Sequence, residues 1–368
     1  MKIGIDAKWY FAGPPSGHMV IKNIVDQILT LKDDNQYILF LDKKFRDKKN
    51  VFSNKNITTV FIWAGNNLLS NLFILPIFAE LYKVDIVVYQ NFSSFFGKHK
   101  KISYIHDILF LSHPHFYTLI EKIYFSPLKF LANISDTIIT VSETEKKRLT
   151  EYGFKKNIYS VYHGVNQMFK PRDNYEKIFL DEIRNTFSLP ERYILYVGRL
   201  NTRKNILNVI KAISRLKNDI KLVIVGKEDW KIFNFNKIIN DLKIKNKIIF
   251  TGFVFGEKLA AIYALSEIFI FPSYAESFGL PPLEAMASGI PVVVSNATCI
   301  PEICGNVGYY VDPDDFIIMS SIIDDILDKK NKEAILVKIR SGVERSKSFT
   351  WESSIKKIIQ ICETTIKK

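Results

Sequence analysis

Short hydrophobic runs alternate with longer stretches of helical period along the whole chain. The runs are KIGID, YILFL, VDIVVYQ, KISYIHD, DTIITVS and IYSVYHG in the first half, and YILYVGR, KLVIVGK, KIIFTGF, IFIFPS and PVVVSN in the second. Between them, stretches such as 20–31, 205–216 and 283–287 carry apolar residues at helical spacing. Strands that are apolar on both faces and alternate with helices are typical of parallel sheets covered on both sides. The pattern therefore predicts an α/β protein with two such sheets.

The two hydrophobic series divide the chain into domains. The first series occupies residues 1–170 and the second occupies residues 191–349. Residues 171–190 between them are polar and charged, with prolines near both ends, which is typical of an interdomain linker with one short helix. Residues 350–368 begin with Thr350, which is placed to cap a final helix. The apolar stripe of this helix must pack on another surface, and we expect that surface to be the first domain.

Composition indicates a folded intracellular chain. The 368 residues are 47% hydrophobic and 24% charged, which excludes a globally disordered protein. Three cysteines are too few for a disulfide framework, and their spacing does not match a zinc site. The first residues read as a strand and contain no apolar signal segment. The sequence therefore predicts a cytoplasmic protein.

The chain is basic, and the excess charge is concentrated in its first half. The formal net charge is +13, and residues 1–170 contain 22 lysines and arginines against 14 aspartates and glutamates. Basic clusters lie at 43–49, 98–101 and 146–148, and a charge-free apolar stretch covers 56–79. Asparagines, a serine and a proline in this stretch argue against a membrane span. We interpret it as loop, helix and partly exposed apolar surface.

Three interpretations fit the basic surplus: a solvated face, an anionic membrane surface, or nucleic acid. Basic clusters near an apolar segment favour peripheral contact with anionic lipid, on the cytoplasmic face of the inner membrane. No nucleic-acid-binding module or aromatic platform motif is visible, so we expect no nucleic acid as a partner. A plain solvated face remains the alternative.

Residues 271–296, FPSYAESFGLPPLEAMASGIPVVVSN, carry the strongest chemical signal. A predicted strand ends in a loop with Glu276 and Gly279, and two prolines follow where the first turn of a helix accepts them. The N-terminus of that helix presents free N–H groups and positive potential, which suits a phosphate. Glu276 and Glu284 flank this anion site, where carboxylates can accept hydrogen bonds from sugar hydroxyls. A solvated loop is the alternative interpretation.

A second group of polar residues follows the strand YILYVG. Arg199, Arg203 and Lys204 come directly after this strand, and ligands of open α/β sheets bind at the carboxyl ends of the strands. Arginine supplies a planar fork of donors and lysine a compact point charge. Arg199 and Lys204 can therefore both reach a diphosphate held at the other helix terminus.

Two further candidates lie in the first half. His106 follows the strand KISYI, at a position suited to a ligand contact, and a buried structural histidine is the alternative. Asp107 is expected to cap or brace the turn. The loop GPPSGHMV follows the first strand, and its Gly17 permits close approach of the backbone to a ligand. The remaining histidines singled out as surface or turn residues are His18, His113, His115 and His163.

These elements, in this order, resemble the retaining GT-B-fold glycosyltransferases of family 4. The matching segments are ESFGLPPLE for the family's E-x7-E motif, GRLNTRK for its Arg-x4-Lys pair, IHD for its first-domain histidine, VSETEKKRL, YHGVN and SFTWE. GLPPLEAMASGIPVVVSN is also similar to the bacterial branch with mannosyl- and rhamnosyltransferases of O-antigen-type surface polysaccharide. The resemblance implies two Rossmann-like, doubly wound domains facing across a cleft, with the C-terminal helix crossing back to the first.

The resemblance also implies roles for individual residues. Arg199 and Lys204 would bind the donor diphosphate, Glu284 the ribose hydroxyls, and the backbone of Val254 the base. Glu276 and the amides that follow it would hold the transferred sugar. The implied catalytic residues are His106, Arg199, Lys204 and Glu276. The implied donor-binding residues are Gly17, Arg199, Lys204, Val254, Glu276, Ser277, Phe278, Gly279, Leu280 and Glu284.

One segment departs from the family pattern. The first loop of the family commonly reads S-G-x-G, whereas here Ser16 and Gly17 are followed by His18 and Met19. Because the second glycine is missing, the first-domain contact to the donor phosphate would come either from a shifted backbone or from His18. The departure concerns the first domain alone.

No metal or other cofactor is expected. Asp312-Pro313-Asp314 has the D-x-D spelling of metal-dependent transferases, but it follows a short strand and contains a stiffening proline, as an ordinary turn does. The resemblance to family 4 implies that arginine, lysine and a helix terminus, in place of a divalent cation, neutralise the leaving diphosphate.

Other enzyme templates are missing from the sequence, which has no G-x-G-x-x-G after its first strand, no Walker motif and no G-x-S-x-G. We predict a hexosyltransferase that moves a sugar from a nucleotide-sugar donor, with mannose from GDP-mannose as the first assignment. The acceptor would be a hydroxyl of a glycan or lipid-linked oligosaccharide, bound by the first domain. The alternatives are a nucleotide-sugar epimerase or phosphorylase of the same fold, or a non-catalytic sugar- or lipid-binding protein.

Overall fold

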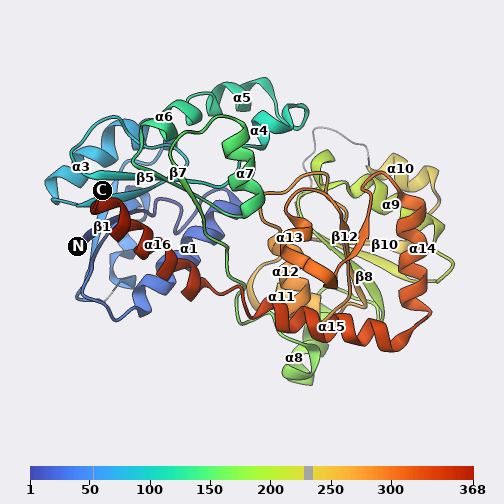
Figure 1. Ribbon diagram of the computed structural model, residues 1–368. Coiled ribbons are helices and arrows are strands. Elements are labelled where there is room, and N and C mark those ends of the chain that lie inside the picture. The colour runs from blue at the N-terminus through green and yellow to red at the C-terminus, as the bar shows by residue number, and fades with distance from the viewer. Residues whose placement is uncertain (53, 228–234) are drawn as a thin grey trace. The chain divides into compact units, whose positions relative to one another are not determined.

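A computed structural model describes residues 1–52, 54–227 and 235–368, and it contains two compact units (Figure 1). Unit 1 comprises Met1–Gly164 and Thr350–Lys368, and unit 2 comprises Val165–Phe349. Each unit is built on one parallel sheet with helices against both faces. The α/β architecture predicted from the hydrophobic pattern is confirmed.

The sheet of unit 1 has the strand order β3-β2-β1-β4-β5-β6-β7, and all its pairs are parallel. The order reverses at β1, which pairs with β2 on one side and β4 on the other. In such sheets the carboxyl ends of the strands at the reversal form the usual ligand site. The strands are β1 (Lys2–Asp6), β2 (Gln36–Asp42), β3 (Ile57–Ile62), β4 (Ile86–Gln90), β5 (Lys100–Ile105), β6 (Thr137–Thr140) and β7 (Asn157–Ser160).

The helices of unit 1 cover both faces of this sheet. α1 and α16 pack against each other on one face, and α3 and α6 lie on the other (Figure 1). The helices are α1 (Pro15–Thr30), α2 (Asn67–Leu69), α3 (Leu75–Leu81), α4 (Leu109–Ser112), α5 (Leu119–Phe125), α6 (Leu128–Ile134), α7 (Glu143–Glu151) and α16 (Trp351–Ile366). Shorter helical turns are η1 (Lys43–Val51), the π-helical η2 (Ser70–Ile74) and η3 (Pro114–Phe116).

Residues 56–79 contain one element that the sequence did not predict. We expected loop and helix, whereas 57–62 form β3, which pairs with β2 along its whole length. β3 lies at the edge of the sheet and only Val60 and Ile62 are buried, so its hydrophobic pattern is weak. The helical part is continuous from α2 through η2 to α3. Within the described residues, no helix combines the length and the apolar character needed to cross a bilayer.

The sheet of unit 2 has the order β10-β9-β8-β11-β12-β13, again with parallel pairs. Here the order reverses between β8 and β11. The strands are β8 (Tyr193–Val197), β9 (Lys221–Val225), β10 (Ile248–Gly252), β11 (Ile268–Phe271), β12 (Val292–Ser295) and β13 (Tyr309–Val311). β11 and β12 are buried at every position, which explains their uninterrupted apolar sequences.

The helices of unit 2 pack on this sheet and on one another. They are α8 (Lys177–Thr186), α9 (Ile206–Arg215), α10 (Phe235–Asp241), α11 (Gly256–Leu265), α12 (Leu280–Ala287), α13 (Ile300–Cys304), α14 (Phe316–Leu327) and α15 (Lys332–Ser346). The shorter turns are η4 (Arg172–Asn174), η5 (Thr202–Lys204), η6 (Lys245–Lys247) and η7 (Gly305–Val307). α12 packs on α15, and α9 packs on α14.

The expected linker at 171–190 is part of unit 2. It contains η4 and α8, and α8 packs on α11 through buried Leu180 and Ile183. The polar composition that suggested a connection comes from the exposed face of this amphipathic helix.

The chain passes between the units at two places that lie side by side. The amide of Val165 donates to the carbonyl of Phe349 (3.0 Å). A Cβ atom on Gly164 would lie 2.1 Å from the backbone nitrogen of Trp351, so only glycine fits there. Thr350 then caps α16 by accepting from the amide of Ser353 (3.1 Å), as predicted. α16 belongs to unit 1 and contacts α1.

Candidate active site

The predicted donor-binding residues of unit 2 follow two neighbouring strands, β8 and β11. These strands are paired in parallel, so their carboxyl ends lie at the same edge of the sheet. Arg199 and Lys204 follow β8, whereas Glu276 and the start of α12 follow β11. The topology thus gathers both motifs at the point where the strand order reverses, which is the usual ligand site of such sheets.

The loop after β8 is held by hydrogen bonds to the rest of unit 2. Asn201 caps η5 by accepting from the amide of Lys204 (3.1 Å). Asn205 adopts a left-handed backbone conformation (φ 58°) and donates to the carbonyls of Pro272 (2.9 Å) and Pro313 (2.6 Å). Asn205 therefore ties three loops together at the carboxyl edge of the sheet. Arg199 lies at the start of this loop and is exposed.

Lys204 and Glu276 form the centre of the site. The Lys204 Nζ lies 2.6 Å from Glu276 Oε1, and the Arg203 guanidinium lies 3.3 Å from the same oxygen. The hydroxyl of Ser273 also donates to it (2.5 Å). Only 12% of the Lys204 side chain and 9% of the Glu276 side chain are exposed. One carboxylate oxygen thus accepts from two cations and a hydroxyl in a largely desolvated place.

This environment shifts the pKa values of both partners. Burial raises the pKa of Glu276, but the charges of Lys204 and Arg203 outweigh this effect and lower the pKa to about 2. Burial lowers the pKa of Lys204 to about 8, although Glu276 opposes the change. At neutral pH both groups are therefore charged. The Lys204 ammonium also lies 4.8 Å from the centre of the Phe271 ring.

The segment from Glu276 to Leu280 leads directly into the N-terminus of α12. Gly279 has φ 100°, and a Cβ atom there would lie 2.8 Å from Ile300 Cδ1, so conformation and space both favour glycine. The amide of Glu276 donates to Thr298 Oγ1 (3.0 Å), which fixes the start of the segment. Phe278 is buried and its ring contacts that of Phe349. Its burial orients the backbone of Ser277–Leu280 around the helix terminus.

Helix α12 begins as the sequence predicted. Pro281 and Pro282 occupy its first turn, where no N–H is needed, and the amide of Leu283 makes the first helical bond, to Gly279 (3.3 Å). Among residues 280–282 only Leu280 carries an N–H, and the helix dipole adds positive potential at this end. This terminus therefore complements the cations of the β8 loop as an anion site.

Glu284 lies one turn further along α12 and has a partner that the sequence did not suggest. The hydroxyl of Tyr263 on α11 donates to Glu284 Oε2 (3.0 Å). Burial raises the pKa of Glu284 to about 8, although the bond from Tyr263 opposes the rise. Tyr263 is itself fully buried, packed on Phe169 and Phe269. In the sequence of α11 this tyrosine resembles the apolar residues around it, so nothing in the sequence indicated its hydrogen bond to Glu284.

Val254 and Gly17 are the two remaining residues that the sequence predicted to bind the donor. Val254 is buried just after β10, two residues beyond Gly252. Gly17 lies in the first turn of α1 and not in a loop, because α1 begins at Pro15. A Cβ atom on Gly17 would lie 2.7 Å from the Trp9 indole, so the glycine makes room for this ring. His18 Nδ1 bonds to the Trp9 carbonyl (2.8 Å), which fixes the same turn.

His106 lies at the carboxyl end of β5 in unit 1, as predicted. Its ring stacks on Tyr104 at 4.9 Å, and burial lowers its pKa to about 4, against a smaller opposing effect of Asp107. Asp107 accepts from the amide of Leu109 (3.1 Å), so its expected bracing role is confirmed. The prediction for His163 was wrong: this residue is buried and contacts the rings of Tyr104 and Trp351.

The VSETEKKRL segment supports the loop that carries His106. Ser142 caps α7 by accepting from the amide of Glu145 (3.0 Å). The carboxylate of Glu145 in turn accepts from the amide of Ile108 (2.8 Å) and pairs with Arg148. This motif therefore fixes the backbone immediately after His106.

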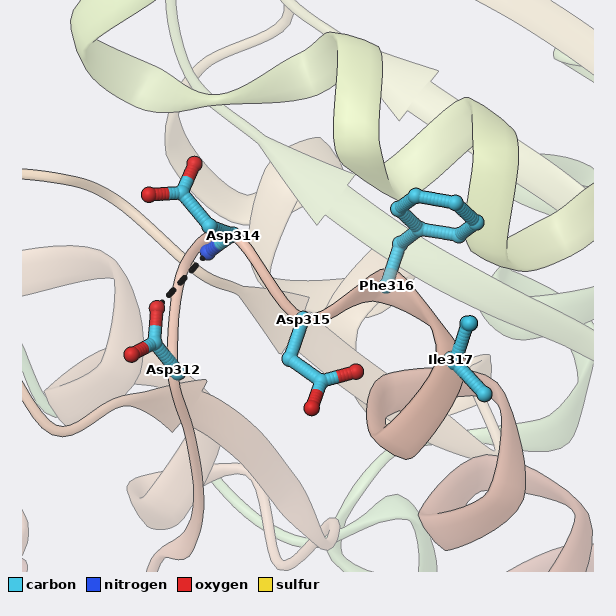
Figure 2. A pocket seen from close by; sticks show the side chains of 5 residues that line it. All are labelled: Asp312, Asp314, Asp315, Phe316 and Ile317. Carbon is cyan, nitrogen blue, oxygen red and sulfur yellow. Dashed lines mark hydrogen bonds between the residues drawn. The ribbon is translucent and has the colours of Figure 1, made fainter.

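The Asp312-Pro313-Asp314 segment lines a pocket in unit 2 (Figure 2). Its carboxylates do not point to a common centre. Asp312 accepts from the amide of Asp314 (2.9 Å), Asp314 from the hydroxyl of Tyr274 (2.6 Å), and Asp315 caps α14 by accepting from Ile318 (2.8 Å). Each carboxylate stabilises local backbone or a neighbouring loop, in agreement with the interpretation of this segment as a turn.

Comparison with known families gives one match for each unit. A model described as "Glycosyl transferases group 1" matches residues 180–339, and one described as "Glycosyltransferase Family 4" matches residues 39–168. The chain belongs to glycosyltransferase family 4. Its two units are the two Rossmann-like domains of the GT-B fold, as the sequence motifs implied.

Curated relatives of this chain include proteins named for O-antigen synthesis. The O-antigen chain mannosyltransferase B of Escherichia coli is 33% identical over 44% of this chain and 43% of its own length. The O-antigen chain mannosyltransferase RfbU of Salmonella typhimurium is 32% identical over 60% of this chain and 59% of its own length. The matches therefore span less than two thirds of these relatives.

Solved structures share the fold over nearly the whole chain. Sucrose-phosphate synthase from Thermosynechococcus elongatus has a TM-score of 0.77 at 18% identity, covering 99% of this chain and 98% of that one. The Anabaena Alr3699/HepE structure in complex with UDP-glucose has a TM-score of 0.76 at 16% identity, covering 99% of this chain and 100% of that one. At these identities the likeness establishes the GT-B fold.

Proposed function

We propose that this glycosyltransferase moves a sugar from a nucleoside diphosphate donor to a hydroxyl of a glycan or lipid-linked oligosaccharide, with retention of anomeric configuration. The observation that carries the proposal is the Lys204–Glu276 pair beside the N-terminus of α12. Two cations and a helix terminus suit the diphosphate, and a fixed carboxylate suits sugar hydroxyls. Relatives named as mannosyltransferases support GDP-mannose as the first donor to test.

Each donor group has a proposed partner in unit 2. The exposed Arg199 and the buried Lys204 contact the diphosphate together with the N-terminus of α12, where Leu280 carries the N–H. Glu276 and the backbone from Ser277 to Leu280 hold the transferred sugar. Glu284, oriented by the hydroxyl of Tyr263, accepts from the ribose hydroxyls, and the backbone at Val254 faces the base.

Unit 1 would supply the acceptor site, and its proposed substrate contacts are His106 and the first turn of α1 around Gly17. The anomeric carbon–phosphate oxygen bond breaks as the acceptor oxygen bonds to the same face of that carbon. The acceptor proton passes to the departing phosphate oxygen. Lys204, Arg199 and the terminus of α12 stabilise the charge that develops on the diphosphate, so the proposal requires no metal ion or other cofactor.

A ligand panel followed by a turnover assay tests this function. A bound ligand raises the melting temperature, so thermal shifts with nucleotides, nucleotide sugars and free sugars identify base and sugar together. We expect a nucleotide sugar to give the largest shift and Lys204→Ala to reduce it. Turnover with an acceptor should release nucleoside diphosphate and form an α-linked product from an α-linked donor, with or without EDTA.

The alternatives give different results in the same assays. Isomerisation of the donor without acceptor would indicate an epimerase, and phosphate-dependent breakdown of glycan would indicate a phosphorylase. Binding without any donor consumption would indicate a non-catalytic sugar-binding protein. An absence of any nucleotide-dependent thermal shift would contradict the donor site itself.

We also propose that unit 1 contacts an anionic membrane at the cytoplasmic face. Leu69, Phe73, Ile77 and Leu81 recur every fourth residue along the continuous helix from α2 to α3 and are 46%, 44%, 58% and 69% exposed. We call these four residues the apolar ridge. Such a contiguous exposed apolar stripe is characteristic of an interaction surface.

The loop after β4 extends the apolar ridge. Phe95 and Phe96 are 52% and 48% exposed, and their rings contact that of Phe73. The loop is fixed, because Ser94 Oγ donates to the Leu72 carbonyl (2.9 Å) and Glu80 accepts from the Lys98 amide (2.7 Å). The exposed Lys98 of this loop and the exposed Lys43, Lys44 and Lys48 of η1 suit anionic headgroups.

Vesicle sedimentation tests this contact. We expect the protein to bind vesicles of phosphatidylglycerol and phosphatidylethanolamine, and to bind phosphatidylcholine vesicles much less. Burying an aromatic side chain is worth about 2 kcal/mol, so Phe95→Ser with Phe96→Ser should weaken binding at least about tenfold. Ile178→Ser is the matched control, since Ile178 is 81% exposed on α8 of unit 2. Equal binding by all variants, or self-association in place of vesicle binding, would refute the assignment.

A further inference from the structure

A cluster of buried polar side chains lies at the carboxyl edge of the unit 1 sheet and contacts His106 through Gln90. Its members are Asp6, Lys8, Asn71 and Gln90. Asp6 ends β1, Gln90 ends β4, and His106 follows β5, and these three strands are neighbours in the sheet. The ring nitrogen Nε2 of His106 lies 2.8 Å from the side-chain oxygen Oε1 of Gln90. A carbonyl oxygen only accepts hydrogen bonds. In this arrangement Nε2 carries the ring proton, and Nδ1 carries the lone pair.

Gln90 is held at both its backbone groups. Its amide donates to Asp6 Oδ2 (3.2 Å), and its carbonyl accepts from Asn71 Nδ2 (3.2 Å). Asn71 also donates to Asp6 Oδ2 (3.0 Å). Asp6 in turn pairs with Lys8 at 2.7 Å, and Lys8 donates to Asn71. The ends of β1 and β4 are therefore locked to each other through side chains.

The members of this cluster are buried far more deeply than a surface ion pair. Asp6 and Gln90 are each 1% exposed, Lys8 is 2% exposed, and Asn71 is fully buried. Burying two charges costs more than their attraction returns unless further hydrogen bonds satisfy them. Apolar residues of similar volume would stabilise the fold as much as this cluster does, or more. We therefore assign the cluster a role in fixing local geometry. The geometry it fixes is the backbone at the end of β4, from which the Gln90 side chain reaches His106.

The surroundings of His106 favour the neutral ring. Tyr104 stacks on it, Trp9 lies 6.4 Å and His163 6.3 Å away between ring centres, and Asp107 is its neighbour in the chain. Burial lowers the pKa of His106 to about 4, and only Asp107 opposes this change. A neutral ring has one donor and one acceptor nitrogen, so the partner of one nitrogen decides what the other can do.

We propose that Gln90 is a positioning residue that holds His106 in the tautomer protonated at Nε2, so that Nδ1 accepts a hydrogen bond from a hydroxyl of the sugar substrate. The inference rests on the proposed function for the identity of the ligand. It assigns Gln90 no contact with substrate. Its basis is the 2.8 Å bond between the Gln90 and His106 side chains and the buried cluster that fixes the Gln90 backbone.

Nitrogen-15 NMR of histidine rings in the full-length protein tests the tautomer without any substrate. We expect the Nε2 signal of His106, assigned by comparison with His106→Gln, to have the shift of a protonated nitrogen and Nδ1 that of an unprotonated one. In Gln90→Met, which fills the space but cannot accept, the two tautomers should mix. The opposite tautomer in the wild type, or no change in Gln90→Met, would overturn the proposal.

Steady-state kinetics distinguish a positioning role of Gln90 from a purely structural one. Loss of one oriented hydrogen bond should lower kcat in Gln90→Met by about tenfold and change the donor KM by less than about twofold. Asn67→Ala is the matched control, because Asn67 also donates to the Gln90 carbonyl (3.2 Å) and is buried, but has no bond to His106. It should keep the wild-type tautomer and nearly the wild-type kcat, because Asn71 still donates to the same Gln90 carbonyl (3.2 Å). Equal losses of kcat in both variants would reduce Gln90 to a structural residue.

A second variant gives a pH signature. In Gln90→Glu a carboxylate faces Nε2–H and stabilises the imidazolium, whose Nδ1 can no longer accept. The pH below which kcat falls should therefore move up from the acidic value set by wild-type His106, and an unchanged pH profile would contradict the proposal. If the wild type transfers no sugar, the proposed function fails, whereas the NMR result for the tautomer still decides the role of Gln90.

Discussion

Replacement of Lys204 by alanine should lower both the rate of transfer and the stability of unit 2. Lys204 Nζ lies 2.6 Å from Glu276 Oε1, and 12% and 9% of the two side chains are exposed. Arg199, the other proposed diphosphate ligand, is exposed at the start of the same loop. The two cations therefore share a proposed role in catalysis and differ in what they contribute to the fold.

The rate effect is set by the charge on the leaving group. Removing one preorganised donor from a developing negative charge costs about 3 kcal/mol of transition-state stabilisation. At about 1.4 kcal/mol per tenfold, this is roughly a 150-fold loss of kcat/KM for Lys204→Ala. Arg199→Ala should lose a similar factor, because it removes a cation from the same diphosphate.

The stability effect is set by the carboxylate left behind. Stranding a buried charge costs about 3 to 5 kcal/mol. Arg203 remains 3.3 Å from Glu276 Oε1 and offsets part of this cost. We expect Lys204→Ala to lose about 2 kcal/mol, which lowers the melting temperature of a unit of this size by roughly 4 to 8 °C. Arg199→Ala should melt within about 1 °C of the wild type.

A double variant separates the two effects. Lys204→Ala with Glu276→Gln removes the stranded charge and keeps an amide able to bond Ser273, so the melting temperature should recover while the rate stays low. Release of nucleoside diphosphate and thermal unfolding measure the two quantities. Wild-type turnover in Lys204→Ala, or a melting temperature equal to that of Arg199→Ala, would refute this account of the site.

Three further predictions concern other parts of the molecule. Glu284→Gln should weaken nucleotide affinity about tenfold by calorimetry, and Tyr263→Phe should weaken it less, because the carboxyl group of Glu284 remains in place. The folded protein keeps a proton on Glu284 that the unfolded chain loses above about pH 4.5, so wild-type stability should fall between pH 5 and 8, and less so in Glu284→Gln. Gly164→Ala places a Cβ 2.1 Å from the Trp351 nitrogen and should lower stability by about 3 kcal/mol in thermal unfolding.

The hydrophobic pattern predicted the fold well because parallel strands buried on both faces leave uninterrupted apolar runs. β11 and β12 are such strands, and both were predicted. β3 was missed because an edge strand is half exposed and its sequence, ITTVFI, lies inside a longer apolar stretch. The linker was misplaced because α8 is amphipathic, and an amphipathic surface helix is as polar on average as a connection.

The motifs of unit 2 were predictable because each is local in sequence. The E-x7-E spacing covers one loop and one helical turn, and the Arg-x4-Lys spacing covers one loop. The partners Tyr263 and Thr298 were not predictable, since each reaches the site through a tertiary contact from another element. The buried cluster of unit 1 was missed for the same reason.

The two adjacent chain crossings at Gly164 and Thr350 have a consequence for synthesis on the ribosome. α16 completes unit 1 and buries one side, including Trp351 and Ile355, yet it is translated after all of unit 2. Unit 2 is one uninterrupted segment and can fold as soon as it emerges. Most of unit 1 is translated first, but it must wait with an uncovered apolar face for the last residues, and during that interval it is open to chaperones and to aggregation.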